Sequence, residues 1–133
     1  MGDSMKGRVA LVSGGGRGIG RGICELLASE GASIAVNYRK DKESALETVA
    51  AITAAGGNAK AYEASVDDPE AVAIMVDHVV ADFGFIDILV CNAGIASRGQ
   101  AVADTEAAEV IRLLNTHAVG PHSLARSALP SMR

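Results

Sequence analysis

The sequence of 133 residues contains no tryptophan, and its two phenylalanines and two tyrosines bring aromatic residues to only 3% of the chain. The hydrophobic fraction is nevertheless 49%, which excludes a disordered chain. The core must therefore be built from Val, Ile, Leu and Ala, whose small side chains let helices and strands approach closely. The length is sufficient for one domain.

Cysteine is also scarce. Cys24 and Cys91 are the only two, and the sequence has no Cys-x-x-Cys or Cys/His spacing. We therefore expect neither a disulfide framework nor a metal site, and a reducing, cytoplasmic location. We interpret Cys91 as a small buried hydrophobic residue.

Long apolar runs and clusters of positive charge are absent as well. Twelve Lys and Arg against 16 Asp and Glu give a net charge of −4 without a basic run, which argues against nucleic-acid binding. No apolar stretch is long enough to span a bilayer, so no membrane contact is expected. Residues 1–7 lack the apolar segment of a signal peptide, and we interpret residues 1–5 as a flexible leader.

What is present is an alternation of short apolar runs with longer amphipathic ones. The pattern predicts strands at 8–13, 33–38, 59–64 and 86–91, and helices at 19–29, 41–55, about 68–83 and 105–132. A kink or break is expected in the last helix at Gly120-Pro121. Four rounds of strand and helix predict an α/β domain with helices on both faces of a parallel sheet. Ligands of such sheets bind at the carboxyl ends of the strands.

A glycine-rich segment, residues 13–20 (SGGGRGIG), lies between the first predicted strand and the first predicted helix. In this place Gly14 permits a tight turn, Gly18 lets the backbone approach a pyrophosphate, and Gly20 lets the helix pack on the strand. The helix N-terminus supplies free amides for phosphate groups. The alternative is a turn whose glycines serve close packing only.

Two motifs resemble those of the short-chain dehydrogenase/reductase family. The glycine loop resembles the family's TGxxxGxG signature with Ser13 in the Thr position, and Cys91-Asn92-Ala93-Gly94 resembles its NNAG motif. The resemblance runs from Lys6 to the last residue and leans towards 3-oxoacyl-acyl-carrier-protein reductases. It implies a Rossmann-type doubly wound sheet, with four strands in the order 3-2-1-4 here and seven in the complete protein. Residues 1–133 would then be one NAD(P)-binding domain that is incomplete at its C-terminal side.

The end of the second predicted strand indicates which dinucleotide is bound. Proteins that bind NAD place an acid there for the ribose 2′-hydroxyl, whereas this strand ends Asn37-Tyr38-Arg39-Lys40. Arg39, with Arg17 of the glycine loop, favours NADP(H) over NAD(H) because guanidinium groups pair with a 2′-phosphate. Alternatively, Arg39 and Lys40 are an ordinary solvated pair.

The candidate cofactor-binding residues come from the glycine loop and from the ends of the other strands. Ser65-Val66 stands where related sequences often have Asp-Val, so a charged acceptor for the adenine amine is lost. The full set is Gly14, Gly16, Arg17, Gly18, Ile19, Gly20, Asn37, Tyr38, Arg39, Ser65, Val66, Asn92, Ala93 and Gly94.

The resemblance implies hydride transfer between NADP(H) and a carbonyl or secondary alcohol, with the catalytic Ser and Tyr-x-x-x-Lys outside this segment. Neither Tyr38 nor Tyr62 fits that motif, so we expect the segment alone to be inactive. Alignment on Gly120-Pro121 puts His117 in place of the family's catalytic Asn. Asn115 takes that role if the register shifts, or His117 merely fills the kink.

The resemblance also implies a homotetramer or homodimer, because such enzymes pair through the long helix that begins near Thr105. The substrate is expected to be a small molecule. A different class of function stays open at this point, namely a non-catalytic dinucleotide-binding or interaction module that is complete at this length.

Overall fold

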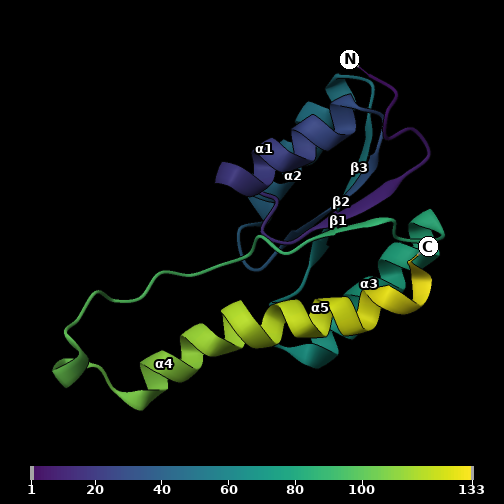
Figure 1. Cartoon of the computed structure of the whole chain (residues 1–133). Helices are drawn as coiled ribbons and strands as arrows, with labels where there is room; N and C mark the ends of the chain where they lie inside the picture. The colour runs from purple at the N-terminus through teal and green to yellow at the C-terminus, as the bar shows by residue number, and fades with distance from the viewer. Residues whose placement is uncertain (1, 133) are drawn as a thin grey trace.

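The chain forms one parallel sheet of four strands (Figure 1). The computed structural model describes residues 2–132. The strands lie side by side in the order β3-β2-β1-β4, which confirms the predicted α/β class and strand order. Their bounds are β1 (Val9–Val12), β2 (Ser33–Tyr38), β3 (Asn58–Glu63) and β4 (Ile88–Val90).

Helices cover both faces of the sheet, as Figure 1 shows. One face carries α1 (Gly18–Ser29) and α2 (Lys42–Ala54), and the other carries α3 (Pro69–Phe83) and α5 (Gly120–Ala128). Successive side chains of a strand point to opposite faces, so Val12 of β1 packs into the core under α1 and α2, whereas Leu11 packs into the core under α3 and α5. The two cores consist mostly of aliphatic side chains, as the low aromatic content requires.

The turn signals place the helix ends correctly. The side chain of Asp68 accepts a hydrogen bond from the Ala71 amide at the start of α3, with Pro69 in the first turn. Gly84 ends the same helix with a φ of +91°, a conformation that favours glycine.

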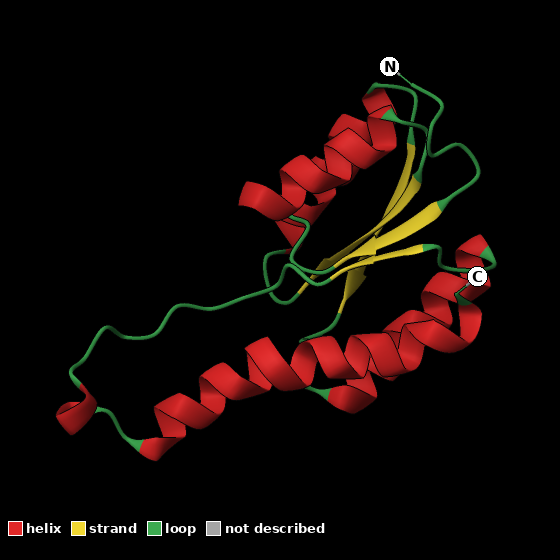
Figure 2. Cartoon of the chain, viewed as in Figure 1, coloured by secondary structure: helices red, strands yellow, loops and turns green. Residues whose placement is uncertain are grey.

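The long C-terminal helix differs from its prediction. It consists of α4 (Ala107–Leu114), the π-helical turn η2 (Asn115–Val119), α5 and the 3₁₀ turn η3 (Leu129–Ser131), and a further 3₁₀ turn, η1 (Val102–Asp104), precedes it. The expected break at Gly120-Pro121 does not occur, because α5 begins at Gly120 directly after η2 ends at Val119. Figure 2 shows the C-terminal helices as one continuous rod. The distortion lies in the turn before it, where the wider π turn η2 relieves the clash that the Pro121 ring would otherwise make with the carbonyl four residues earlier.

The interpretation of Cys91 as a buried residue is also wrong. Cys91 is exposed, whereas Cys24 is buried in α1. The reason is that β4 ends at Val90, so Cys91 already lies outside the strand.

The first residues contact the end of α1. Within the expected leader, the amides of Gly2 and Met5 donate to the carbonyls of Ser29 and Glu30 at 2.9 and 2.8 Å. The flexibility of residues 1–5 stays a prediction. Among the helices of residues 2–132, none combines the length and hydropathy that crossing a bilayer requires.

Candidate dinucleotide site

The carboxyl ends of the strands border a cavity of about 470 Å³. The glycine loop, the end of β2, the residues after β3 and the loop after β4 all contribute to its lining, so the structure brings together the segments that the sequence analysis singled out. The lining residues are Gly14, Gly16, Arg17, Asn37, Tyr38, Arg39, Lys40, Asp41, Ser44, Ala64, Ser65, Val66, Asn92, Ala93, Gly94, Ile95 and Thr116. Within residues 2–132, no three His, Cys, Asp or Glu side chains gather as a metal site.

Ser13 and Asn92 join the ends of β1 and β4 at the floor of this cavity. The Ser13 hydroxyl accepts hydrogen bonds from the amides of Asn92 and Ala93 at 2.9 and 3.0 Å. The Asn92 side chain donates in return to the carbonyls of Ser13 and Gly14 at 3.2 and 3.1 Å. Each motif therefore positions the other.

Asn37 has a comparable joining role at the end of β2. Its side-chain oxygen accepts from the Gly14 amide at 3.3 Å, and its nitrogen donates to the carbonyl of Ala64 at 3.0 Å. The residue is 1% exposed. Asn37 lines the cavity, and its polar atoms bond to the protein and tie together the ends of three strands. Its predicted contact with a cofactor stays a prediction.

Two glycines of the loop have no tolerance for a side chain. Gly14 has a φ of +66°, and a Cβ there would lie 3.0 Å from the Cα of Ala93. A Cβ on Gly20 would lie 2.5 Å from the side-chain nitrogen of Asn92. The close approach at Gly20 is therefore between α1 and the loops that follow β1 and β4.

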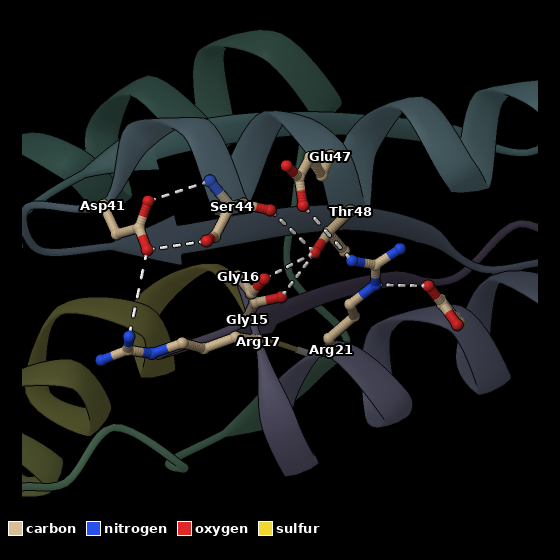
Figure 3. Close-up of polar contacts among 9 residues, drawn as sticks. Gly15, Gly16, Arg17, Arg21, Asp41, Ser44, Glu47 and Thr48 are labelled. Carbon is tan, nitrogen blue, oxygen red and sulfur yellow. Dashed lines mark hydrogen bonds and ion pairs between the residues drawn. The ribbon is translucent and has the colours of Figure 1, made fainter.

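Thr48 holds the glycine loop from the other side, and sequence reasoning missed it. Its hydroxyl lies 3.1 and 3.2 Å from the carbonyl oxygens of Gly15 and Gly16 (Figure 3), and the residue is fully buried. A signal was present, because Thr48 lies between Ala45 and Ile52 on the apolar face of α2. A polar residue on a buried face needs a partner.

The cavity is strongly charged beside the end of β2. Arg17, Arg39 and Lys40 bring three cations to the lining, and Asp41 is the single carboxylate among the lining residues. Asp41 caps α2, accepting at 3.0 Å from the Ser44 amide and at 2.7 Å from the Ser44 hydroxyl, and the guanidinium of Arg17 lies 4.0 Å from it (Figure 3). The hydrogen bonds from Ser44, and the charge of Arg17 to a lesser degree, hold the pKa of Asp41 below its usual range.

The π-helical turn presents Thr116 to the cavity and His117 to the loop after β4. Thr116 is buried and lines the cavity, a contribution that the sequence did not reveal. Nε2 of His117 lies 2.8 Å from the carbonyl oxygen and 3.2 Å from the amide nitrogen of Ile95. A Cβ added to Gly94 would meet the His117 ring at 2.8 Å.

A buried carboxylate anchors the same loop further along. Glu109 of α4 forms ion pairs with Arg98, at 3.2 Å, and with Arg112. Arg112 also donates to the carbonyl of Ala96 at 3.1 Å. These charged side chains attach the loop after β4 to α4, an attachment that no local motif indicated.

The two tyrosines differ in position, because Tyr38 lines the cavity at the end of β2 and Tyr62 is not among the lining residues. The phenol of Tyr62 donates to Asp82 at 2.6 Å near Lys60, and burial together with that hydrogen bond raises the Tyr62 pKa. Tyr38 lines the cavity, and burial and the charge of Glu63 raise its pKa. Both phenols therefore stay protonated at neutral pH.

Most of the predicted site residues line the cavity, and the others lie outside its lining. Eleven of the fourteen candidate cofactor residues line the cavity, and the cavity also has lining residues that were not predicted: Lys40, Asp41, Ser44, Ala64, Ile95 and Thr116. Gly18 and Ile19 open α1, Gly20 packs behind the loop, and Ser65 bonds to Asp67 while lining the cavity. Asn115 and His117 are outside the lining.

Comparison with known proteins gives consistent matches over nearly the whole chain. The family model described as short chain dehydrogenase matches residues 8–133. Versicolorin reductase 1 from Aspergillus parasiticus is 41% identical over 129 residues, covering 97% of this chain and 49% of the relative. The 3-oxoacyl-[acyl-carrier-protein] reductase of Staphylococcus aureus is 40% identical over 123 residues, covering 92% of this chain and 50% of the relative. The chain thus spans about half the length of these curated relatives.

Solved structures agree with this picture. A short chain dehydrogenase from Burkholderia cenocepacia J2315 in complex with NADP superposes with a TM-score of 0.92 at 39% identity, covering 97% of this chain and 52% of that one. A dehydrogenase/reductase from Sinorhizobium meliloti 1021 superposes with a TM-score of 0.94 at 36% identity, covering 97% and 51% of the two chains.

Proposed function

The chain belongs to the short-chain dehydrogenase family, and from this membership we propose that the protein is an NADP(H)-dependent oxidoreductase acting on a carbonyl or secondary alcohol of a small molecule. One observation carries the proposal. The cavity joins a glycine loop at a helix N-terminus to the three cations of Arg17, Arg39 and Lys40, which are the features that a pyrophosphate and a 2′-phosphate require.

The residues present fit such a dinucleotide. The positive φ of Gly14 and the open space at Gly18, where an added Cβ would meet nothing, leave the backbone accessible to phosphate oxygens. Arg17 and Arg39 would hold the 2′-phosphate, while Ser65-Val66 would border the adenine and Asn92-Ala93-Gly94 the ribose and nicotinamide. Ile19 is 78% exposed beside the loop, which supports contact with a ligand. When bound, the cofactor supplies or accepts a hydride.

The chain's own residues would orient and enclose the cofactor rather than transfer the proton. Protonation of the developing alkoxide needs an acid near the nicotinamide, and the family provides one through Tyr-x-x-x-Lys with a Ser. Tyr38 and Tyr62 have no such setting, so we propose that residues outside this sequence provide the acid. His117 is proposed as a positioning residue that fixes Ile95 and the loop after β4, with Asn115 as the alternative if the register shifts.

The proposed assembly is a homodimer or homotetramer in the cytoplasm. Support for self-association comes from α4, where Val110, Ile111 and Leu114 form an apolar strip that is about half exposed. The 133 residues are proposed to form one domain with the remainder of the sheet. The relative in Staphylococcus aureus named above supports a 3-oxoacyl substrate attached to a carrier protein.

The proposal is tested by titrating the complete protein with NADPH and by following NADPH oxidation with a panel of ketones and 3-oxoacyl thioesters. We expect enhanced nucleotide fluorescence on binding and turnover with at least one carbonyl compound. Binding without turnover would favour the non-catalytic module, and absence of NADPH binding would refute both.

A further inference from the structure

We propose that Asp41 is a specificity-determining residue that weakens the hold of this cavity on a 2′-phosphorylated adenine ribose, and so moderates the preference for NADP(H). The inference rests on the proposed function. It starts from two opposite charges on one wall of the cavity, where the Asp41 carboxylate lies 4.0 Å from Arg17, one of the two arginines proposed to hold the extra phosphate.

The oxygens of Asp41 are already engaged by the protein. One oxygen accepts from the Ser44 amide, and the other accepts from the Ser44 hydroxyl and faces Arg17 (Figure 3). Because these bonds stabilise the charged form, Asp41 stays an anion at neutral pH. Asp41 also lies three residues beyond the end of β2 at Tyr38, whereas proteins that bind NAD place their acid at the strand end. Asp41 therefore does not create a typical NAD site.

The charge of Asp41 acts against the 2′-phosphate in two ways. It repels the phosphate directly, and to a smaller degree it competes for Arg17 through their long, exposed ion pair. The opposite effect, that Asp41 holds Arg17 in a useful orientation, is weaker, because the Arg17 side chain is 83% exposed and the pair is long. Exposed ion pairs of this kind contribute little to positioning. Removal of the charge should therefore strengthen binding of the phosphorylated nucleotide.

The test compares Asp41→Asn with the wild-type complete protein. Asparagine caps helices about as well as aspartate, so the variant removes the charge and keeps the start of α2. The dissociation constants of NADPH and NADH are measured by nucleotide fluorescence. We expect NADPH to bind about three- to ten-fold more tightly, a change of the size given by one unit charge at short range in water. The dissociation constant of NADH should change by less than about two-fold.

Asp68→Asn is the matched control. Asp68 caps α3 through the same kind of bond, to the Ala71 amide at 3.2 Å, but it is not among the residues that line the cavity. Asp68→Asn should change the dissociation constants of NADPH and NADH by less than about two-fold relative to the wild-type protein. The gain for Asp41→Asn should shrink as salt is raised from 0.05 to 0.5 M, since exposed charges are screened. Asp41→Ser repeats the test if Asp41→Asn lowers the melting temperature.

The outcomes separate the inference from the proposed function. An unchanged or lower ratio of NADPH to NADH affinity in Asp41→Asn overturns the role of Asp41, while the dinucleotide site stands. An equal increase in affinity for NADPH and NADH overturns it too, because the effect of Asp41 would then not depend on the 2′-phosphate. Failure of the wild-type protein to bind either nucleotide refutes the proposed function itself.

Discussion

The hydroxyl of Ser13 and the side-chain amide of Asn92 form a reciprocal bridge between the carboxyl ends of β1 and β4. Ser13 accepts from the backbone amide of Asn92 at 2.9 Å, and the Asn92 side chain donates to the carbonyl of Ser13 at 3.2 Å. The residues are 79 positions apart. These hydrogen bonds consequently fix the glycine loop and the loop after β4 relative to each other.

Ser13→Ala should destabilise the fold by about 1–3 kcal/mol, because the amides of Asn92 and Ala93 lose a buried acceptor. Urea unfolding, followed by circular dichroism, measures the change. Ser13→Thr is the control, since it retains the hydroxyl and should cost well under half as much. Equal losses in the two variants would mean that packing rather than hydrogen bonding fixes this position.

Gly18→Ala and Gly22→Ala form a matched pair at the start of α1. Gly18 has a φ of +57°, whereas Gly22 is exposed within the helix, and an added Cβ meets nothing at either residue. Alanine at 22 should stabilise the protein by about 0.5–1 kcal/mol without changing NADPH binding. Alanine at 18 should destabilise it by about 1–2 kcal/mol and lower NADPH affinity at least ten-fold. Unchanged NADPH affinity in Gly18→Ala would argue against phosphate binding at this loop.

The sequence predicted those parts of the fold and site that depend on neighbouring residues, and it missed those that depend on residues far apart in the chain. Strands built around a short apolar run, such as Ser33–Tyr38, and the cap formed by Asp68 follow from local rules, and they were predicted closely. The bonds from Thr48 to the glycine loop join residues more than 30 positions apart, so no local pattern contains them. The placement of Thr116 in the cavity also depends on a π turn, which has no reliable local signature.

The error at Cys91 has a related physical cause. Its apolar neighbours predicted a strand as far as residue 91, but pairing of β4 with β1 ends at Val90, opposite Val12. The length of β1, which stops at the glycine loop, therefore limits β4. The exposure of Cys91 therefore depends on the length of β1, which cannot be read from the sequence of β4 alone.

Arg17→Ala and Arg39→Ala should each weaken NADPH binding about ten-fold or more, because a charge-assisted hydrogen bond contributes about 1.5–3 kcal/mol. NADH binding should change by less than about two-fold. Fluorescence titration gives both constants. Lys42→Ala serves as control, since Lys42 lies one residue beyond Asp41 but is not among the residues that line the cavity. Equal losses for NADPH and NADH would contradict a 2′-phosphate site.

The two thiols should differ in reactivity. Iodoacetamide at pH 8 should modify Cys91, which is exposed, and leave Cys24 intact, because burial raises the pKa of Cys24 to about 12. Intact mass should therefore increase by one adduct in the native protein and by two in urea. Desolvation of its sulfur also raises the pKa of Cys91, so its alkylation should accelerate above pH 8. Modification of Cys24 at an equal rate would contradict its burial.

The same pKa shift predicts a loss of stability in alkali. The Cys24 thiol is neutral in both states below its unfolded pKa of about 8.5, so folding carries no penalty there. As the pH rises from this value towards about 12, the unfolded state ionises and the folded state does not, which favours unfolding. Urea unfolding at pH 8 and pH 10 should show a decrease in stability that is smaller in Cys24→Ala.

His117 offers the sharpest test of a role in positioning. One ring nitrogen faces both the carbonyl and the amide of Ile95, and in a given tautomer it can serve only one of them. An asparagine side chain can donate to the first and accept from the second. His117→Asn should therefore keep kcat within about three-fold, whereas His117→Ala should lower kcat about ten-fold by releasing the loop. His117→Asn should change the dissociation constant of NADPH by less than about two-fold, because it holds the loop and His117 itself does not line the cavity. If His117 were a proton relay, His117→Asn would instead remove one ionisation from the pH profile of kcat. An asparagine variant as slow as the alanine variant would likewise exclude positioning as its role.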